Sequence, residues 1–231
     1  MTSTPTQAAA KAPRQIFESI FAFPPNRDTL GGTAYLILET DAQGVAANLL
    51  VDCPALEPLY LDFIAARGGL SWLFITHRGG IGRARELQAR FNCPIVIQEQ
   101  EAYLLPRAQL TSFQQTFSFS LISRALWTPG HSPGSACLYY QRYGGVLFSG
   151  RHLLPNRQGQ PLPLRSSKTF HWPRQLRSVQ QLVDTFEPDT LTHLCPGAST
   201  GFLRGRYTVE AAYEQLHAID LEACRQQSPL L

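Results

Sequence analysis

Apolar positions in the first half of the chain alternate between the period of strands and the period of helices. The pattern predicts strands at Ala34–Glu39, Val45–Val51, Trp72–Thr76 and Pro94–Ile97. It also predicts a helix from near Pro58 to Gly68-Gly69 and another that ends near Asn92. The faces expected to turn inward carry Leu56, Leu59, Tyr60, Phe63 and Ile64 in the first helix, and Leu87 and Phe91 in the second. This order favours a partly parallel sheet covered by helices.

The second half combines shorter strands with Gly/Pro-rich loops. The predicted strands are Ala125–Trp127, Cys137–Tyr140, Val146–Ser149 and Leu191–Leu194. A helix opened by Pro173 carries the inward set Leu176, Val179, Leu182, Val183 and Phe186. Thr208 is expected to cap a last helix with Ala212, Leu216, Ile219 and Ala223 inward. Two strand-rich halves with their own helices predict an α/β sandwich of sheets between helical layers.

Composition agrees with a globular α/β chain. The 231 residues are 44% hydrophobic and 16% charged, enough for a sizeable core and too apolar for a disordered chain. We expect a disordered N-terminal tail over residues 1–15, which are rich in Ser, Thr, Ala, Pro and Gln, and a single domain over residues 16–231. No run approaches the roughly 18 apolar residues of a membrane span, so we expect no membrane contact.

Net charge and cysteine content limit the partners and the cellular location that we expect. The net charge of +3 is too small to argue for a nucleic-acid partner. The five cysteines are odd in number, and no pair has Cys-x-x-Cys spacing. A disulfide framework and a zinc ribbon are therefore not expected, and a reducing, cytoplasmic location is.

Candidate chemistry gathers in loops that follow predicted strands. Open α/β sheets place ligands at the carboxyl ends of their strands. Five such loops occur in order: Asp52-Cys53-Pro54, Thr76-His77-Arg78-Gly79-Gly80, Thr128–Ser135, Ser149-Gly150-Arg151-His152 and Leu194–Ala198. The third contains Pro-Gly-His-Ser-Pro-Gly, which makes this series of loops the candidate site.

In this order the loops resemble the motifs of the metallo-β-lactamase superfamily, from about Phe21 to Gly205. The resemblance implies an αββα four-layer sandwich and a site that holds one or two zinc or iron ions, whose bound hydroxide hydrolyses lactams, thioesters or phosphodiesters. The second loop, extended to Ala84, also resembles a cyanobacterial and plant-type branch that reads Thr-His-Arg-Asp-Asp-Val-Ala-Asp-His. The pair Trp172-Pro173 matches the start of a helix in that branch.

The departures from the family pattern concern its metal ligands. Asp52 matches the first motif, and among the ligand positions only His77 and His131 keep a histidine. Five ligand positions of the general pattern carry other residues here, namely Gly79, Ile81, Gly82, Arg151 and Ala198. In the branch pattern, Gly79 and Gly80 replace the two Asp of the second motif, and Arg83-Ala84 replace its Asp-His.

Zinc catalysis needs about three protein ligands and an open position for water. A permanent guanidinium where the family has a bridging Asp repels a metal. We therefore assign no catalytic residue and no metal ligand, and expect no cofactor. The resemblance implies a vestigial active-site cleft formed by Asp52, His77, Arg78, His131, Arg151 and His152.

The expected function is binding, of a partner protein or of a small anion in the old cleft. The alternative is a metal-dependent hydrolase of thioesters, lactams or phosphodiesters with an atypical ligand set and zinc or iron as cofactor. For that case His152, Cys53 and Cys195 remain possible replacement ligands beside His77 or His131. A homodimer is compatible with either function, and nucleic acid ranks last as a partner.

Arg151 allows two structural interpretations. It follows a predicted strand, so its guanidinium should project into the cleft. We expect it to pair with Asp52, because an unpaired buried charge is costly. The other interpretation leaves Arg151 free to form an anion pocket with Arg78 and glycine N–H groups.

Overall fold

Short apolar runs form two large sheets in the computed structural model, which describes residues 11–199 and 201–229. The first sheet runs in chain order from β1 to β7. Its strands are β1 (Arg14–Phe17), β2 (Ile20–Ala22), β3 (Tyr35–Ile37), β4 (Leu49–Val51), β5 (Trp72–Ile75), β6 (Ile95–Gln98) and β7 (Leu110–Phe113). The strands β4 to β7 are parallel, as the alternation of strands and helices predicts.

The second sheet has the order β15-β14-β11-β10-β9-β8. Its strands are β8 (Thr116–Ser118), β9 (Ser123–Trp127), β10 (Ala136–Tyr140), β11 (Val146–Gly150), β14 (His193–Pro196) and β15 (Val209–Glu210). A separate hairpin pairs β12 (Leu154–Pro155) with β13 (Pro161–Leu162). The helices are α1 (Pro58–Ala65), α2 (Ala84–Phe91), α3 (Trp172–Thr185), α4 (Ala212–His217) and α5 (Leu221–Arg225).

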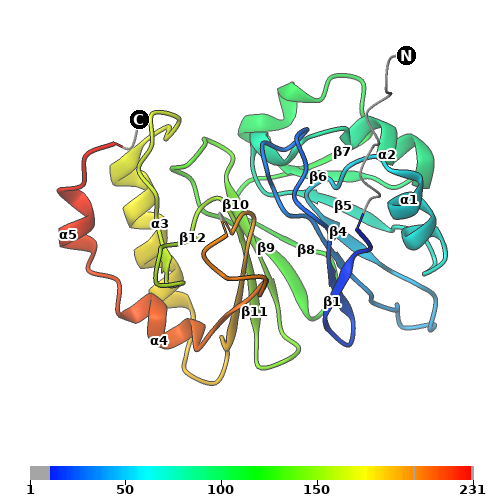
Figure 1. The fold of residues 1–231 in the computed structure, drawn as a ribbon. Helices are drawn as coiled ribbons and strands as arrows, with labels where there is room; N and C mark the ends of the chain where they lie inside the picture. The colour runs from blue at the N-terminus through cyan, green and yellow to red at the C-terminus, as the bar shows by residue number, and fades with distance from the viewer. Residues whose placement is uncertain (1–10, 200, 230–231) are drawn as a thin grey trace, which may run out of the picture.

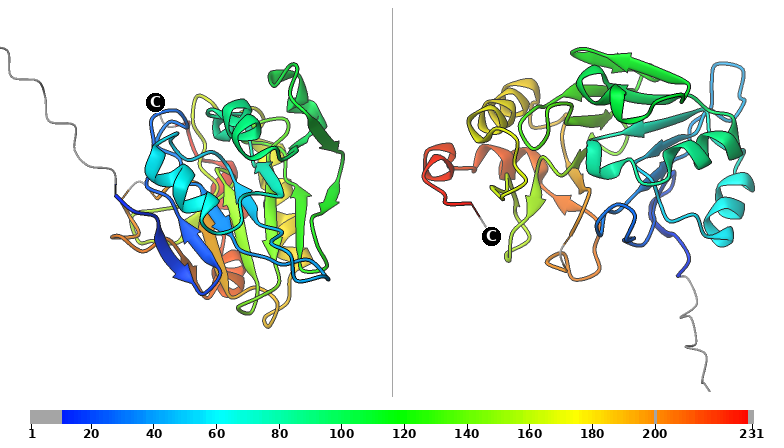
Figure 2. Two further views of the ribbon diagram at one scale, coloured as in Figure 1. Left: turned by 90° about the vertical axis from the view of Figure 1, so that its right-hand side faces the viewer. Right: turned by 90° about the horizontal axis from the view of Figure 1, so that it is seen from above.

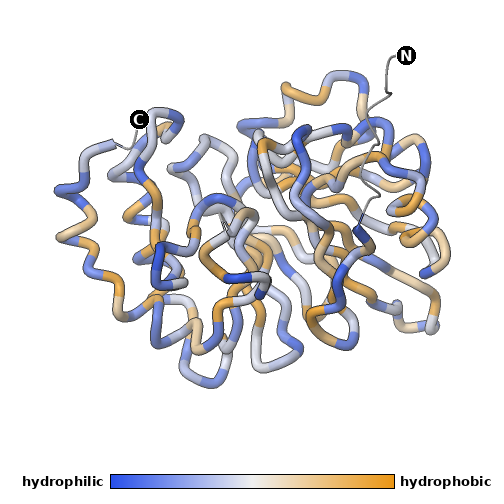
Figure 3. Tube along the Cα trace, in the orientation of Figure 1, coloured by the Kyte–Doolittle hydropathy of each residue, from blue (hydrophilic) through white to orange (hydrophobic). Residues whose placement is uncertain are grey.

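The elements stack in four layers, which confirms the predicted αββα architecture. In Figure 1, α1 and α2 cover the right-hand sheet, and α3 to α5 cover the left-hand one. The right-hand view in Figure 2, seen from above, also places the sheets between the two helical layers. Hydrophobic segments concentrate along the inner strands (Figure 3).

Alternation along the strands sorts the apolar side chains into separate cores. Leu49 and Val51 of β4 pack between the two sheets, whereas Leu50 packs against the α1 and α2 side. On β10, Leu138 faces the first sheet, and Tyr139 faces α3 and α4. A strand that is buried on both faces has apolar residues at successive positions. These central strands could therefore be predicted from the sequence.

Four local predictions need correction. The tail predicted over residues 1–15 overlaps β1, which begins at Arg14; residues 1–10 lie outside the described part of the chain. Leu59 is 43% exposed and does not face the core. Thr208 does not cap a helix, because Val209 pairs with Leu194 at the edge of the second sheet. The single last helix is instead two short ones, and Asp220 caps the second.

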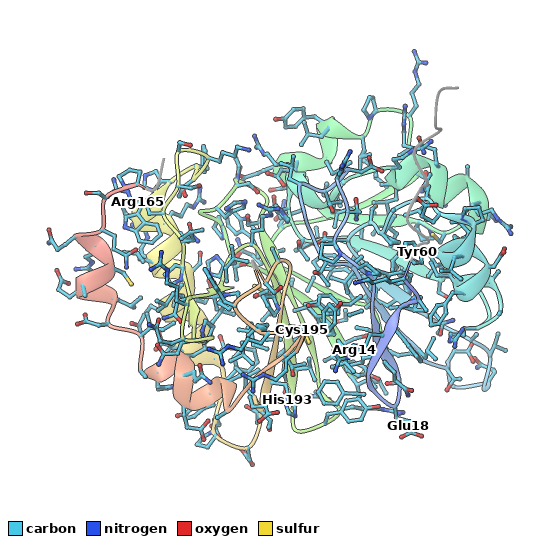
Figure 4. The ribbon with its side chains drawn as sticks, viewed as in Figure 1. Arg14, Glu18, Tyr60, Arg165, His193 and Cys195 are labelled. Atoms are coloured by element: carbon cyan, nitrogen blue, oxygen red, sulfur yellow. The ribbon has the colours of Figure 1, made fainter. Side chains whose placement is uncertain are left out.

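All five cysteines are free and buried. Cys195, near the middle of the molecule in Figure 4, is 0% exposed and packs in the core between the sheets. Cys53 packs in the core under α1 and α2. In the part of the chain that the structure describes, no helix has both the length and the apolar character of a membrane span.

Candidate functional site

Parallel pairing brings the chemistry-bearing loops to one edge of the sandwich. The strands β4 and β5 run parallel, so Asp52 and Thr76 follow their carboxyl ends side by side. In the other sheet β11 and β14 are also parallel, which places Arg151 next to the loop that follows Pro196. The edge between the two sheets therefore collects loops from both halves of the chain.

Asp52 is held in a fixed position behind the site. It is buried and adopts a left-handed backbone with φ of 57°. Its Oδ1 accepts the Thr76 backbone N–H at 2.8 Å, and its Oδ2 accepts the Thr76 hydroxyl at 2.7 Å. A Cβ on Gly80 would lie 2.2 Å from Oδ1, so only glycine fits there. Burial raises the pKa of Asp52 to about 6, against the lowering effect of both hydrogen bonds.

The same hydroxyl fixes the ring of His77. Thr76 Oγ1 lies 2.9 Å from His77 Nδ1. Because its one proton goes to Asp52, Thr76 Oγ1 accepts here, and His77 Nδ1 carries the proton. Burial, helped by His131, Arg151 and Arg78, holds the pKa of His77 well below its usual value. In the neutral ring the other nitrogen, Nε2, is a hydrogen-bond acceptor. It is buried, and none of the described residues is its partner.

Burial also favours the neutral form of His131 and His152. The rings of His77 and His131 have centroids 5.2 Å apart in an edge-on arrangement. Burial lowers the pKa of His131 to about 4, and the pKa of His152 to about 3. His152 is 1% exposed, and neither ring nitrogen has a partner. Its carbonyl accepts a hydrogen bond from the buried Gln175 side chain of α3.

Arg151 does not pair with Asp52, so the predicted ion pair is wrong. Its Nη2 donates instead to the backbone carbonyls of Thr29 and Leu30, at 3.2 and 2.7 Å. Nε is buried without a partner. Among the described residues no carboxylate lies within 4.0 Å of this guanidinium. Two carbonyl dipoles replace the carboxylate, and the positive charge remains uncompensated at short range.

Arg78 has a different environment. Its Nε donates to Glu101 Oε1 at 2.8 Å, and the Glu101 side chain is fully buried. The Arg78 side chain is itself 45% exposed. The ion pair therefore fixes one edge of the Arg78 guanidinium and leaves the remainder accessible to a ligand.

A pocket of about 340 Å³ opens over these groups. His77, Arg78, His131 and Arg151 line it, whereas Asp52 and His152 are buried and are not among the lining residues. The other lining residues are Leu30, Gly79, Ser132, Lys168 and Phe170. A neighbouring hollow of about 350 Å³ shares His131, Arg151 and Lys168. The site thus has a cationic, imidazole-bearing floor.

Comparison with known proteins agrees with this arrangement of sheets. A B3 metallo-β-lactamase, BLEG-1, superposes with a TM-score of 0.61 at 19% identity over 87% of this chain and 99% of its own. A Cronobacter sakazakii metallo-β-lactamase with a HARLDQ motif gives 0.60 at 14% identity, over 94% and 100% of the two chains. The protein TTHA1623, in a di-iron-bound form, gives 0.56 at 19% identity, over 80% and 92%.

The chain has the metallo-β-lactamase fold. No protein-family model matches the sequence, and no curated protein matches it significantly. The expected cyanobacterial or plant-type branch stays a prediction.

The side chains at this edge of the sandwich do not fit a metal ion. Within residues 11–199 and 201–229, no three His, Cys, Asp or Glu side chains are grouped so that they could hold a metal ion. Asp52 is committed to Thr76, and the Arg151 guanidinium faces the same pocket. Cys53 and Cys195, considered as replacement ligands, are instead core residues.

Sequence reasoning missed several groups of the site. Glu101 follows β6 (Ile95–Gln98), so the strand-end rule that found His77 applies to it as well. Leu30 lies in the β2–β3 loop, and Lys168 and Phe170 lie in the long connection before α3. No motif or periodicity marks these loops, so only the folded structure identifies them.

Replacement of Thr76 by Val should destabilise the protein by about 2–3 kcal/mol. The isosteric change leaves Asp52 Oδ2 and His77 Nδ1 buried without a partner, and unpaired buried polar groups carry this cost. Urea unfolding of the variant measures it. The matched control is Thr128→Val, also fully buried, whose hydroxyl contacts only the Cys137 sulfur at 3.3 Å. Equal losses in both variants would mean that the Asp52–Thr76–His77 chain contributes nothing specific.

Proposed function

We propose that this protein is a non-catalytic member of the metallo-β-lactamase fold that binds a small anion in the cleft. One observation carries the proposal: the Arg151 guanidinium lines the pocket, and no carboxylate of the described residues lies within ion-pair distance of it. A half-buried charge of this kind is stabilised when a ligand supplies the opposite charge.

The rest of the cleft supports an anion in two ways. Arg78 and Lys168 line the same pocket, so three cations surround a volume suited to a small molecule. The planar arginine side chains suit bidentate capture of a carboxylate or phosphate. The concave shape also favours a small ligand over the alternative of a partner protein.

The metal-dependent hydrolase remains the rival function, and the unpartnered Nε2 of His77 is the observation in its favour. Two imidazoles without a carboxylate ligand fall short of the roughly three ligands that catalytic zinc uses. Metal content of protein purified without a histidine tag separates the two functions. Stoichiometric zinc or iron together with hydrolysis of nitrocefin or a thioester would contradict the proposal.

Removal of the Arg151 charge should weaken anion binding at least about tenfold. A charge-assisted hydrogen bond contributes roughly 1.5–3 kcal/mol, and Arg151→Met deletes it. Calorimetric titration with phosphate, sulfate and acetate measures the affinity, and thermal shifts give a second readout. Arg151→Lys keeps the charge and should retain part of the binding.

The matched control is Arg85→Met, which removes an exposed arginine of α2 that does not line the pocket. This variant should bind anions as the original protein does. Equal losses in Arg85→Met and Arg151→Met would indicate attraction by overall charge and would contradict a built site. Absence of binding to all three anions and to benzoate would contradict it as well.

A further inference from the structure

We infer that the natural ligand of the cleft is an aromatic carboxylate that carries a hydroxyl group, with the hydroxyl donating to His77 Nε2 and the carboxylate bound by the arginines. This inference rests on the proposed anion site and names the chemical class of its ligand. Three independent features of the pocket carry it: an acceptor, a cationic group and an apolar rim.

The acceptor is His77 Nε2, because the hydrogen bonds among Asp52, Thr76 and His77 have a fixed donor and acceptor order. Asp52 accepts from Thr76, so Thr76 accepts from His77 Nδ1. The lone pair of Nε2 then points away from these hydrogen bonds. His77 is 4% exposed and lines the pocket, and Nε2 has no partner. A buried acceptor without a donor is costly, and a ligand O–H removes that cost.

Gly79 keeps the space next to this nitrogen open. A Cβ at position 79 would lie 2.9 Å from His77 Nε2 and 3.2 Å from Cδ2. Any other residue would therefore press on the ring at the atom that needs a partner. The glycine that stands at a former ligand position in the family pattern thus leaves room beside Nε2.

Unpartnered polar atoms concentrate around this cleft. Six of the nine buried side-chain atoms without a hydrogen-bond partner, counted over the described residues, belong to five residues of this region. They are His77 Nε2, Glu101 Oε2, Arg151 Nε, His152 Nδ1 and Nε2, and Gln175 Oε1. Of these residues, His77 and Arg151 line the pocket, the first with an acceptor and the second with a donor. A bare anion offers acceptors only, so a ligand that also donates can satisfy His77 Nε2 as well.

The rim supplies the apolar feature. Leu30 and Phe170 line the pocket and are 62% and 54% exposed. Leu164, 38% exposed, lines the neighbouring hollow. Three of the large exposed hydrophobic residues therefore lie on the pocket or on the hollow next to it. An aromatic ring packs favourably against Phe170 and Leu30, with its carboxylate toward Arg78 and Arg151.

The test compares 3- and 4-hydroxybenzoate with their methyl ethers, 3- and 4-methoxybenzoate. Methylation removes the donor and keeps the ring, the carboxylate and the oxygen. Calorimetric titration should show that at least one hydroxybenzoate binds about fivefold or more tightly than its ether, the ratio expected for one hydrogen bond of about 1 kcal/mol. In His77→Phe this ratio should fall to one, while Arg151→Met should weaken both ligands of a pair equally.

A measurement on the unaltered protein covers the case in which His77→Phe does not fold. Nitrogen-15 chemical shifts of the histidine rings report which nitrogen carries the proton. His77 should be protonated at Nδ1 only, and its Nε2 resonance should shift when the hydroxybenzoate binds and stay in place with the ether.

The outcomes separate this inference from the function on which it rests. Equal affinity for each hydroxybenzoate and its ether, or a proton on His77 Nε2, overturns the inference and leaves anion binding intact. Failure of benzoates, phosphate, sulfate and acetate to bind at all overturns both. Binding of phosphate without any benzoate overturns only the aromatic class.

Discussion

Lowering the pH from 7 to 4 is expected to remove several kcal/mol from the free energy of unfolding. The pKa values of His131 and His152 are lowered to about 4 and about 3, and that of His77 lies well below its usual value. In the unfolded chain these rings take up a proton near pH 6.5. The unfolded state therefore binds more protons between pH 6.5 and 4, and stability falls by about 1.4 kcal/mol per pH unit for each such ring.

Asp52 opposes this trend over a narrower window. Its folded pKa of about 6 lies above its ordinary value of 3.8, so it contributes stability at low pH that is lost as the pH rises through 6. One carboxyl opposes three imidazoles, so the net effect of acid remains destabilising. Urea titrations at pH 7, 6, 5 and 4 measure the slope.

His152→Gln should flatten this profile, because one of the three buried rings is gone. The matched control is His217→Gln, which changes an exposed ring on α4 and should leave the slope as it is. A free energy of unfolding that does not change between pH 6.5 and 4 would show that the buried histidines are protonated in the folded protein.

Gly130→Ala should destabilise the protein by about 3 kcal/mol or more. Gly130 has φ of +143°, and a Cβ there would lie 2.2 Å from the Cα of Gln175 and 2.3 Å from its nitrogen. The obstacle is backbone of α3, which cannot turn aside as a flexible side chain can. The Pro129–Pro133 loop must therefore move away from α3, and His131 moves with it.

Gly44→Ala is the control for this variant. Gly44 also has a positive φ, +79°, but nothing lies within 4 Å of its Cβ position. It should lose only about 1 kcal/mol, the cost of a left-handed backbone for alanine. Thermal and urea unfolding of both variants separate the steric clash from the backbone strain. Similar losses would contradict the tight contact between the loop and α3.

The sequence predicted the central strands well because they are buried on both faces. Strands such as β5 and β10 read as continuous apolar runs. The edge strands were missed: β8 alternates exposed and half-buried residues over three positions, and the start of β1 is exposed. Such short, polar strands form because a neighbour pairs with them, and their own pattern carries too little of that information.

The site was predictable to the extent that it depends on strand ends. Parallel pairing brings His77 and Arg151 to one edge, so the loops that carry them could be grouped from sequence. The partner of Arg151 could not be, because it bonds to a carbonyl of Thr29, 122 residues earlier in the chain. Every residue has a backbone carbonyl, so the sequence does not show which carbonyls will bind an arginine. Asp52 was predicted as the partner because its side chain carries the opposite charge.

The hydrogen bonds from Arg151 to the carbonyls of Thr29 and Leu30 have a consequence for protein engineering. A designer who wished to build a metal centre in this cleft would naturally begin with an aspartate at position 151. That carboxylate would face two carbonyl oxygens, so acceptor would meet acceptor. It would also lose one of the contacts between the β2–β3 loop and the second sheet. The hairpin loop would have to be redesigned first, and only then could ligands be added one at a time.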